Sequence, residues 1–330
     1  MIHNSQKRTK LVAILGPTSA GKTFLSLKLA KKFNGEIISA DSRQVYKDLD
    51  IGSAKISKQE QSLVPHHLLD VISPKKRYSV AQYQQNAKSA AAQITSRGKL
   101  PFLVGGTAFY IYAVIDNLTI PKVKPNPKLR KQLEKKTAEE LFRMLKKLDP
   151  ERAKNIDVKN KRRLIRAIEI IKSTGLPVPS QHFFPLLQKQ ESILGKILDQ
   201  VEEESDHGVL ILGLNPKDNK ARIAKNVKTR FKKGLLTEVQ NLIIKGVSLK
   251  RLNEIGLTYK LVAEYLHVHK NARSRKNEYK ELIDKVIKAE QQYARRQMTW
   301  FKRDSRIKWI TTQKQAEKYI TPFLRRQESK

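Results

Sequence analysis

The stretch that decides the fold is Leu11-Val12-Ala13-Ile14-Leu15-Gly16-Pro17-Thr18-Ser19-Ala20-Gly21-Lys22-Thr23. Its first five residues are apolar and predict a buried strand, and its last eight have the spacing G-x-x-x-x-G-K-T. Residues 24–33 continue with apolar side chains at helical spacing. A strand, a glycine-containing turn and a helix in this order predict a phosphate-binding loop, or P-loop, rather than a chance match in a turn.

The chemistry of this loop follows from its residue types. The glycines allow backbone N–H groups to surround a phosphate chain at a helix N-terminus, Lys22 adds a positive charge, and the Thr23 hydroxyl can hold Mg²⁺. The pattern leaves open whether the phosphates belong to ATP or to another diphosphate. The residues expected to bind the diphosphate are Gly16, Pro17, Thr18, Ser19, Ala20, Gly21, Lys22 and Thr23, with Thr23 as the metal ligand.

Two further strands are expected to end beside the P-loop. Residues 36–40 predict a strand that runs into Asp41, and residues 101–104 predict one that runs into Gly105-Gly106-Thr107. Ligands of open α/β sheets lie outside the carboxyl ends of the strands, so the three segments should meet at one edge. Asp41 can serve there as a Mg²⁺ ligand or a general base, or it can simply cap the next turn.

A separate helical unit is predicted after the first three strands of the core. Residues 120–127 are rich in proline and should end one element before a new unit starts. Residues 129–148 and 150–173 look helical and basic, and the apolar strand 209–214 then returns the chain to the sheet. A helical insertion of about eighty residues fits this order.

The rest of the chain completes the core. Residues 222–242 predict a helical stretch with a break near Gly234, residues 278–302 predict one long helix, and residues 308–310 predict a last short strand. We therefore expect an α/β protein with a P-loop NTPase-like parallel-sheet core and a helical insertion domain. The expected boundaries are 1–120 for the first part of the core, 121–205 for the insertion and 206–330 for the second part of the core with C-terminal helices.

Composition narrows the class of protein. The chain has 330 residues and a net charge of +36, and Lys and Arg outnumber Asp and Glu in each of the segments 1–120, 121–205, 206–269 and 270–330. Such a charge suits a nucleic-acid partner, although a general preference for lysine would also produce it. The chain has no cysteine, which excludes disulfides, thiolate catalysis and cysteine-ligated metals. No apolar run has membrane-spanning length and no signal peptide is evident, so a cytoplasmic protein without membrane contact is expected.

Several longer motifs accompany the P-loop in a fixed order. They are Asp41-Ser42-Arg43-Gln44-Val45-Tyr46-Lys47-Asp48-Leu49-Asp50-Ile51-Gly52-Ser53-Ala54-Lys55, His66-His67-Leu68-Leu69-Asp70, Leu103-Val104-Gly105-Gly106-Thr107-Ala108-Phe109-Tyr110 and Tyr293-Ala294-Arg295-Arg296-Gln297-Met298-Thr299-Trp300-Phe301. The combined pattern resembles the tRNA dimethylallyltransferase family, also named the tRNA isopentenyltransferase or IPP transferase family. The motifs span most of the chain, and the run that begins at Asp41 is far more specific than the P-loop.

The resemblance implies a definite reaction. The P-loop would hold the diphosphate of dimethylallyl diphosphate, and the N6 amine of the adenosine on the 3′ side of a tRNA anticodon would displace pyrophosphate from the allylic carbon. Asp41 would be the general base on N6, with Thr107 beside it. Lys22 and Thr18, with Arg222 and with Mg²⁺ on Thr23, would stabilise the leaving pyrophosphate.

The resemblance also implies how tRNA is bound. The target adenine must leave its stack, and the helical insertion would grip the anticodon stem-loop. A monomer is the oligomeric state that the resemblance implies. The residues that match the family's tRNA contacts are Asp41, Ser42, Arg43, Gln44, Thr107, Arg130, Arg162, Arg163, Leu164, Ile165 and Arg166.

Two positions depart from the family pattern. Asn226 stands where the family usually has an arginine near the diphosphate, so either Lys225, Lys228 or Arg230 replaces that arginine or the diphosphate is held more weakly. The family's glycine-tyrosine-basic turn occurs here as Gly256-Leu257-Thr258-Tyr259-Lys260. Two other functions remain as alternatives: a P-loop small-molecule kinase, and a nucleotide-gated RNA-binding protein without catalysis.

Overall fold

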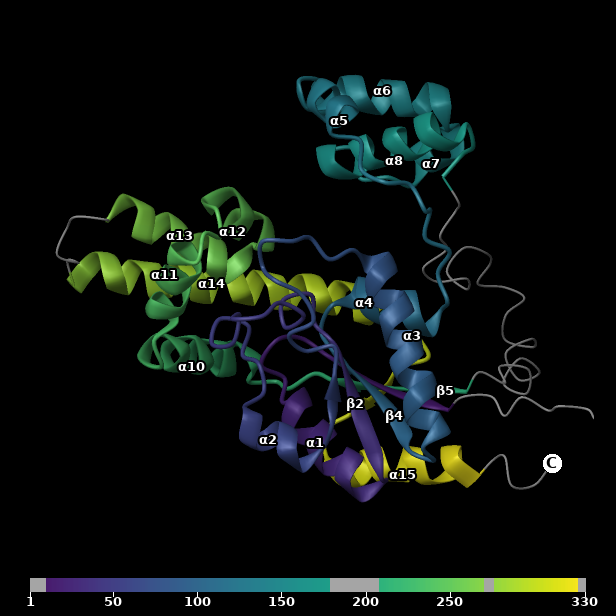
Figure 1. The fold of residues 1–330 in the computed structure, drawn as a ribbon. Helices are drawn as coiled ribbons and strands as arrows, with labels where there is room; N and C mark the ends of the chain where they lie inside the picture. The colour runs from purple at the N-terminus through teal and green to yellow at the C-terminus, as the bar shows by residue number, and fades with distance from the viewer. Residues whose placement is uncertain (1–9, 179–207, 270–275, 326–330) are drawn as a thin grey trace, which may run out of the picture. The chain divides into compact units, whose positions relative to one another are not determined.

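The protein, studied as a computed structural model, is described for residues 10–178, 208–269 and 276–325. The described residues form two compact units: one contains residues 10–115 and the described residues from 208 onward, and the other contains residues 116–178. The first unit carries the P-loop and the parallel sheet, and the second is helical (Figure 1).

A six-stranded parallel sheet is the framework of the first unit. Its strand order is β3-β2-β4-β1-β5-β6, so the P-loop strand β1 lies inside the sheet between β4 and β5. All five side chains of β1 are buried, as expected for an interior parallel strand. The strands are β1 Leu11–Leu15, β2 Gly35–Ala40, β3 His66–His67, β4 Leu100–Gly105, β5 Val209–Leu214 and β6 Lys308–Ile310.

Helices cover both faces of this sheet. Helices α1 (Lys22–Lys32) and α15 (Gln313–Arg325) bury their apolar side chains on one face, against residues such as Val12, Ile14 and Phe102. Helix α3 (Val80–Ser96) packs against β2 and β4, and α4 (Ala108–Ile115) packs against α3. Short helix α2 spans Lys58–Leu63. The predicted α/β class with a parallel sheet is confirmed.

A group of helices follows β5. Helix α14 packs against α4, α10 and α13, and α11 and α12 pack against α13 (Figure 1). The predicted helical stretch 222–242 divides at Gly234, whose φ of +95° suits glycine and which begins the second helix. The predicted break near Gly234 is thus confirmed. The bounds are α10 Asn219–Lys232, α11 Leu235–Ile244, α12 Leu249–Ile255, α13 Leu257–Val268 and α14 Lys276–Phe301.

The second unit is built from four helices around its own core. The core includes Leu133, Leu141, Leu145, Leu164 and Ile168. The helices are α5 Pro127–Glu134, α6 Ala138–Leu148, α7 Pro150–Lys154 and α8 Lys161–Thr174. Part of the predicted insertion, residues 179–205, lies outside the described residues.

Both helices predicted for this unit are divided. In the first, Thr137 accepts a hydrogen bond from the N–H of Glu140, and Glu140 bonds back to Thr137, which forms a capping box and starts α6. In the second, Asn160 caps α8 by accepting from the N–H of Arg163. The expectation of two long helices was wrong because it overlooked these cap residues.

In the ranges given above, no helix is both long enough and apolar enough to cross a membrane.

Candidate active site

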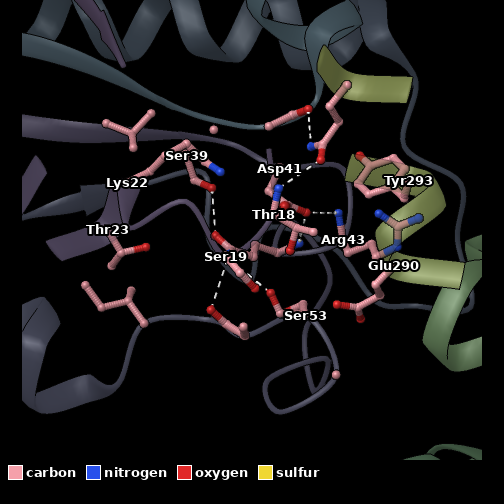
Figure 2. A pocket seen from close by; sticks show the side chains of 18 of the residues that line it. Thr18, Ser19, Lys22, Thr23, Ser39, Asp41, Arg43, Ser53, Glu290 and Tyr293 are labelled. Carbon is pink, nitrogen blue, oxygen red and sulfur yellow. Dashed lines mark hydrogen bonds between the residues drawn. The ribbon is translucent and has the colours of Figure 1, made fainter. Parts of the chain in front are cut away.

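The candidate active site is a cavity at the carboxyl ends of β1, β2 and β4. Because β4 lies between β1 and β2, the P-loop, the Asp41 turn and the Gly105-Gly106 turn meet at this edge. Figure 2 shows Lys22 and Thr23 on one side of the cavity and Glu290 and Tyr293 on the other. The convergence predicted from the three strands is confirmed.

The P-loop adopts a conformation that depends on glycine. Gly16 has a φ of +152°, and a Cβ at this position would lie 2.5 Å from the carbonyl oxygen of Leu214 in β5. Helix α1 begins directly after Gly21, so its first backbone N–H groups, which have no partner within the helix, lie at the cavity. A bound diphosphate would meet these N–H groups and the positive end of the helix dipole.

Lys22 is held beneath the loop. Its Nζ donates to the carbonyl oxygens of Gly16 at 3.0 Å and Pro17 at 2.7 Å. Desolvation lowers the pKa of Lys22 to about 8, although the negative charge of Asp41 opposes this shift. A diphosphate in the cavity would compensate the desolvated ammonium directly.

Asp41 is fixed by its own turn. Its Oδ1 accepts from the backbone N–H groups of Arg43 at 2.8 Å and Gln44 at 3.4 Å. Thr107 lies beside this turn, since its Oγ1 accepts from the N–H of Ser42 at 3.1 Å. Asp41 therefore caps its turn and also lines the cavity, which places a carboxylate within the same space as Lys22.

Helix α14 supplies a wall of the cavity that the sequence analysis did not assign. Gln297 joins two loops, because it accepts from the N–H of Thr18 at 2.9 Å and donates to the carbonyl oxygen of Gly106 at 2.6 Å. Glu290, Tyr293 and Gln297 are three and four positions apart, which places them on one helix face. The spacing of these three polar side chains along the predicted long helix was the sequence signal that could have indicated a cavity wall.

Two arginines flank the aromatic ring on this wall. The guanidinium of Arg43 lies 5.3 Å from the centre of the Tyr293 ring, and that of Arg296 lies 5.9 Å from it. Both distances fit cation–π interactions. The turn of Asp41 is thereby joined to α14 across the cavity.

Helix α10 lies beside the P-loop. Asn226 donates from Nδ2 to Ser19 Oγ at 3.0 Å, and Nη1 of Arg222 lies 3.8 Å from the place that a Cβ on Gly21 would occupy. Of the candidates to replace the missing arginine, Arg230 lines the cavity, whereas the side chains of Lys225 and Lys228 are exposed.

The predicted tRNA contacts of the second unit have different environments. Arg162 and Arg163 are exposed on α8. Leu164 and Ile165 are 0% and 6% exposed and belong to the core, so their side chains cannot contact a partner. The 3.6-residue helical repeat turns both side chains inward, so their assignment to tRNA contacts stays a prediction that only their backbone could fulfil.

Arg130 and Arg166 are paired within this unit. Arg130 donates to both carboxylate oxygens of Glu169, at 2.8 and 2.6 Å, and Arg166 donates to Oε2 at 2.6 Å. Burial alone would raise the pKa of Glu169, but hydrogen bonds from Arg130, the Asn126 N–H and Arg166 outweigh it and lower the pKa to about 2. The charge of these arginines is thus partly neutralised.

Comparisons with known proteins point to one family. The family model described as IPP transferase matches residues 44–304, and the model described as isopentenyl transferase matches residues 9–70. The tRNA dimethylallyltransferase of Syntrophomonas wolfei is 37% identical over 305 residues, with 91% of each chain covered. This chain belongs to the tRNA dimethylallyltransferase family. It is therefore a member of a family of transferases.

Solved structures of the family are similar as well. The tRNA isopentenylpyrophosphate transferase of Bacillus halodurans has a TM-score of 0.66 and 33% sequence identity, with 97% of this chain and 98% of that chain covered. A eukaryotic dimethylallyltransferase acting on tRNA has a TM-score of 0.68 and 26% identity, with 88% of this chain and 69% of that chain covered. The P-loop NTPase-like core expected from the sequence is confirmed by these likenesses.

Proposed function

We propose that this protein transfers a dimethylallyl group from dimethylallyl diphosphate to N6 of the adenosine on the 3′ side of the tRNA anticodon and releases pyrophosphate. The observation that carries this proposal is the single cavity lined by the P-loop, with Lys22, and by Asp41. The names of the relatives support a tRNA substrate and a dimethylallyl donor.

The residues have complementary roles in this reaction. The C–O bond between the allylic carbon and the diphosphate breaks while the N6–C bond forms, and negative charge grows on the leaving diphosphate. Lys22 and the N–H groups at the start of α1 stabilise that charge, and Arg222 lies beside the same loop. The N6 proton passes to the carboxylate of Asp41, since an amine conjugated to a purine is a poor nucleophile.

Magnesium fits the donor set of this cavity. Thr23 follows the P-loop lysine and lines the cavity together with Asp41. In the described residues, no group of three or more His, Asp or Glu side chains is arranged to hold a metal. A magnesium ion would therefore be held by Thr23 and by the oxygens of the diphosphate, where it would supply positive charge to the leaving group.

The proposal extends to the side chains that contact tRNA. The adenine must be flipped from its stack to reach the cavity. Arg43 and Gln44 beside Asp41, and Arg162 and Arg163 on α8, are the side chains that we assign to tRNA contacts. The net charge of +36 supports a polyanionic partner. We propose a cytoplasmic monomer.

Family membership favours the transferase over the two alternatives. A small-molecule kinase does not need the basic helical unit, and a nucleotide-gated RNA-binding protein does not need Asp41 and Thr107 at the P-loop. Label transfer tests all three. The protein is incubated with Mg²⁺, an anticodon stem-loop with adenosine at the 3′ side of the anticodon, and labelled dimethylallyl diphosphate or labelled ATP. We expect label in the RNA from the allylic donor alone, whereas turnover of ATP without prenyl transfer would refute the proposal.

A further inference from the structure

The loop of residues 50–54, here named the wall loop, forms part of the cavity. Gly52, Ser53 and Ala54 line it. The side chain of Gln44 connects the wall loop to the Asp41 turn, because its Nε2 lies 3.4 Å from the carbonyl oxygens of Ser53 and Ala54. The backbone N–H of Gln44 in turn donates to Asp41 Oδ1. The wall loop is therefore two hydrogen bonds away from the predicted base.

A carboxylate on helix α11 holds the wall loop. Glu238 Oε2 accepts from the N–H groups of Asp50 at 2.9 Å and Ile51 at 2.5 Å, and Oε1 accepts from the N–H of Gly52 at 2.9 Å. Three consecutive backbone donors thus converge on one charged side chain, which is 186 or more positions away in the sequence. Hydrogen bonds to charged groups are stronger than neutral ones.

Two neighbours complete this attachment. Tyr259 donates from its hydroxyl to Glu238 Oε1 at 2.9 Å, and its ring packs so closely on Gly52 that a Cβ there would lie 2.6 Å from it. Arg230 donates to the carbonyl oxygen of Gly52 at 2.7 Å. The same arginine is paired with Glu290 at 2.6 Å, and Glu290 also accepts from Thr258. The first turn of helix α13, which begins at Leu257, therefore fastens the wall loop through Thr258 and Tyr259.

We propose that Glu238 is a positioning residue for the transfer reaction: it fixes the wall loop and, through Gln44, the carboxylate of Asp41. This inference rests on the proposed function. It gives a role to two sequence motifs, the Asp50-to-Lys55 run and residues 256–260 at the start of helix α13, that the transfer chemistry itself leaves without one. The P-loop itself is held separately, by Lys22 and Gln297.

The test compares Glu238→Gln with a matched control. Glutamine keeps the size of the side chain but leaves only one acceptor oxygen for three N–H groups and a hydroxyl. The control is Glu254→Gln on α12. Glu254 also accepts hydrogen bonds from two arginines, Arg77 at 3.1 Å and Arg251 at 3.2 Å, yet it does not line the cavity. Both variants and the wild type are studied by hydrogen exchange, thermal unfolding and transfer kinetics.

We expect amide exchange at residues 50–52 to rise at least about tenfold in Glu238→Gln and to stay unchanged in Glu254→Gln. We expect kcat to fall about tenfold or more in Glu238→Gln, because a small displacement of a catalytic group costs that much, while KM for dimethylallyl diphosphate stays within about threefold. Tyr259→Phe removes one of the bonds to Glu238 and should give a smaller effect of the same kind. It replaces Glu238→Gln if that variant does not fold.

Two results would overturn the inference. One is wild-type kcat in Glu238→Gln despite faster exchange at residues 50–52. The other is an equal fall of kcat in Glu254→Gln, which would indicate a general loss of stability. Failure of the proposed function is distinguishable, because the wild type itself would then show no transfer to RNA.

Discussion

The Asp41 turn allows the base to be removed without disturbing the fold. In Asp41→Asn the amide oxygen can still accept from the N–H groups of Arg43 and Gln44, whereas the basic carboxylate is lost. We expect single-turnover transfer to fall about 10²- to 10⁴-fold and RNA affinity to stay within a few-fold. Asp48→Asn is the control, since Asp48 is paired with Lys245 outside the cavity. Equal losses of affinity and rate would count against Asp41 as the base.

The lowered pKa of Lys22 predicts a pH dependence of donor binding. Below a pH of about 8 the side chain is an ammonium ion that can neutralise a diphosphate, and above it the free enzyme loses this charge. The association constant for inorganic pyrophosphate, measured by calorimetry, should therefore fall as pH rises through about 8, with a slope approaching tenfold per pH unit. In Lys22→Arg the guanidinium remains charged, so this fall should be absent, and the ratio of wild-type to variant affinity at each pH cancels the titration of pyrophosphate itself. A wild-type profile parallel to that of the variant would refute this prediction.

The residues that the sequence correctly brings together are those that belong to short local motifs. The P-loop, Asp41 and Thr107 follow from short motifs after strands, and the structure brings them to one cavity edge. Gln297 meets Thr18 across 279 positions, and no local pattern gives that pairing. Helical periodicity places Leu164 on the apolar stripe of its helix, and the structure buries it with Ile165; both were assigned to tRNA only because they lie within the 162–166 run that matches the family.

Gln297 of helix α14 joins the P-loop to the Gly105-Gly106 turn. In Gln297→Leu the Thr18 N–H and the Gly106 carbonyl lose their partner inside the protein. Leaving such groups unpaired costs about 1–3 kcal/mol, which should appear as a lower free energy of unfolding in urea. KM for the allylic donor should rise about tenfold as the P-loop relaxes. The control is Gln291→Leu on the same helix, whose amide makes a long contact of 3.4 Å with the carbonyl oxygen of Lys220; similar changes in both variants would contradict a specific role of Gln297.

At the scale of elements, most helices and strands of the core were predictable, but some boundaries were not. The Gly234 break was predicted because glycine punctuates helices, and its φ of +95° gives the reason. The Thr137–Glu140 capping box was equally visible as T-x-x-E, yet the apolar periodicity continues across it. Strand β3 was missed because a strand of two residues, His66–His67, has no period to read.

At the scale of the molecule, the parallel sheet could be predicted but its strand order could not. Strands that each run into a phosphate-binding or polar loop imply a common edge. The order β3-β2-β4-β1-β5-β6 depends instead on which strands pair across long stretches of chain, which hydrophobic runs do not specify. Residues 179–205 of the predicted 121–205 insertion lie outside the described residues.

The net charge of +36 predicts that binding of the anticodon stem-loop weakens steeply with salt, because each phosphate contact releases counterions. The charge is distributed over the whole chain, so only particular arginines separate specific contacts from a general attraction. Arg162 and Arg163 are exposed, whereas Arg130 and Arg166 are already paired with Glu169. We therefore expect Arg162→Ala and Arg163→Ala each to lower the slope of log affinity against log salt by about 0.7 to 1.

The matched control for these arginines is Lys154→Ala in the same unit, which removes an exposed cation that is paired with Glu151. Filter binding of the stem-loop between low and moderate salt measures all three slopes, and pyrophosphate affinity should be unchanged in each variant. If Lys154→Ala lowers the slope as much as the arginine variants do, the attraction is a property of total charge and the second unit makes no specific contacts through α8. A smaller change for Lys154→Ala would assign the contact to Arg162 and Arg163, because these two exposed cations of α8 would then be responsible for the released counterions.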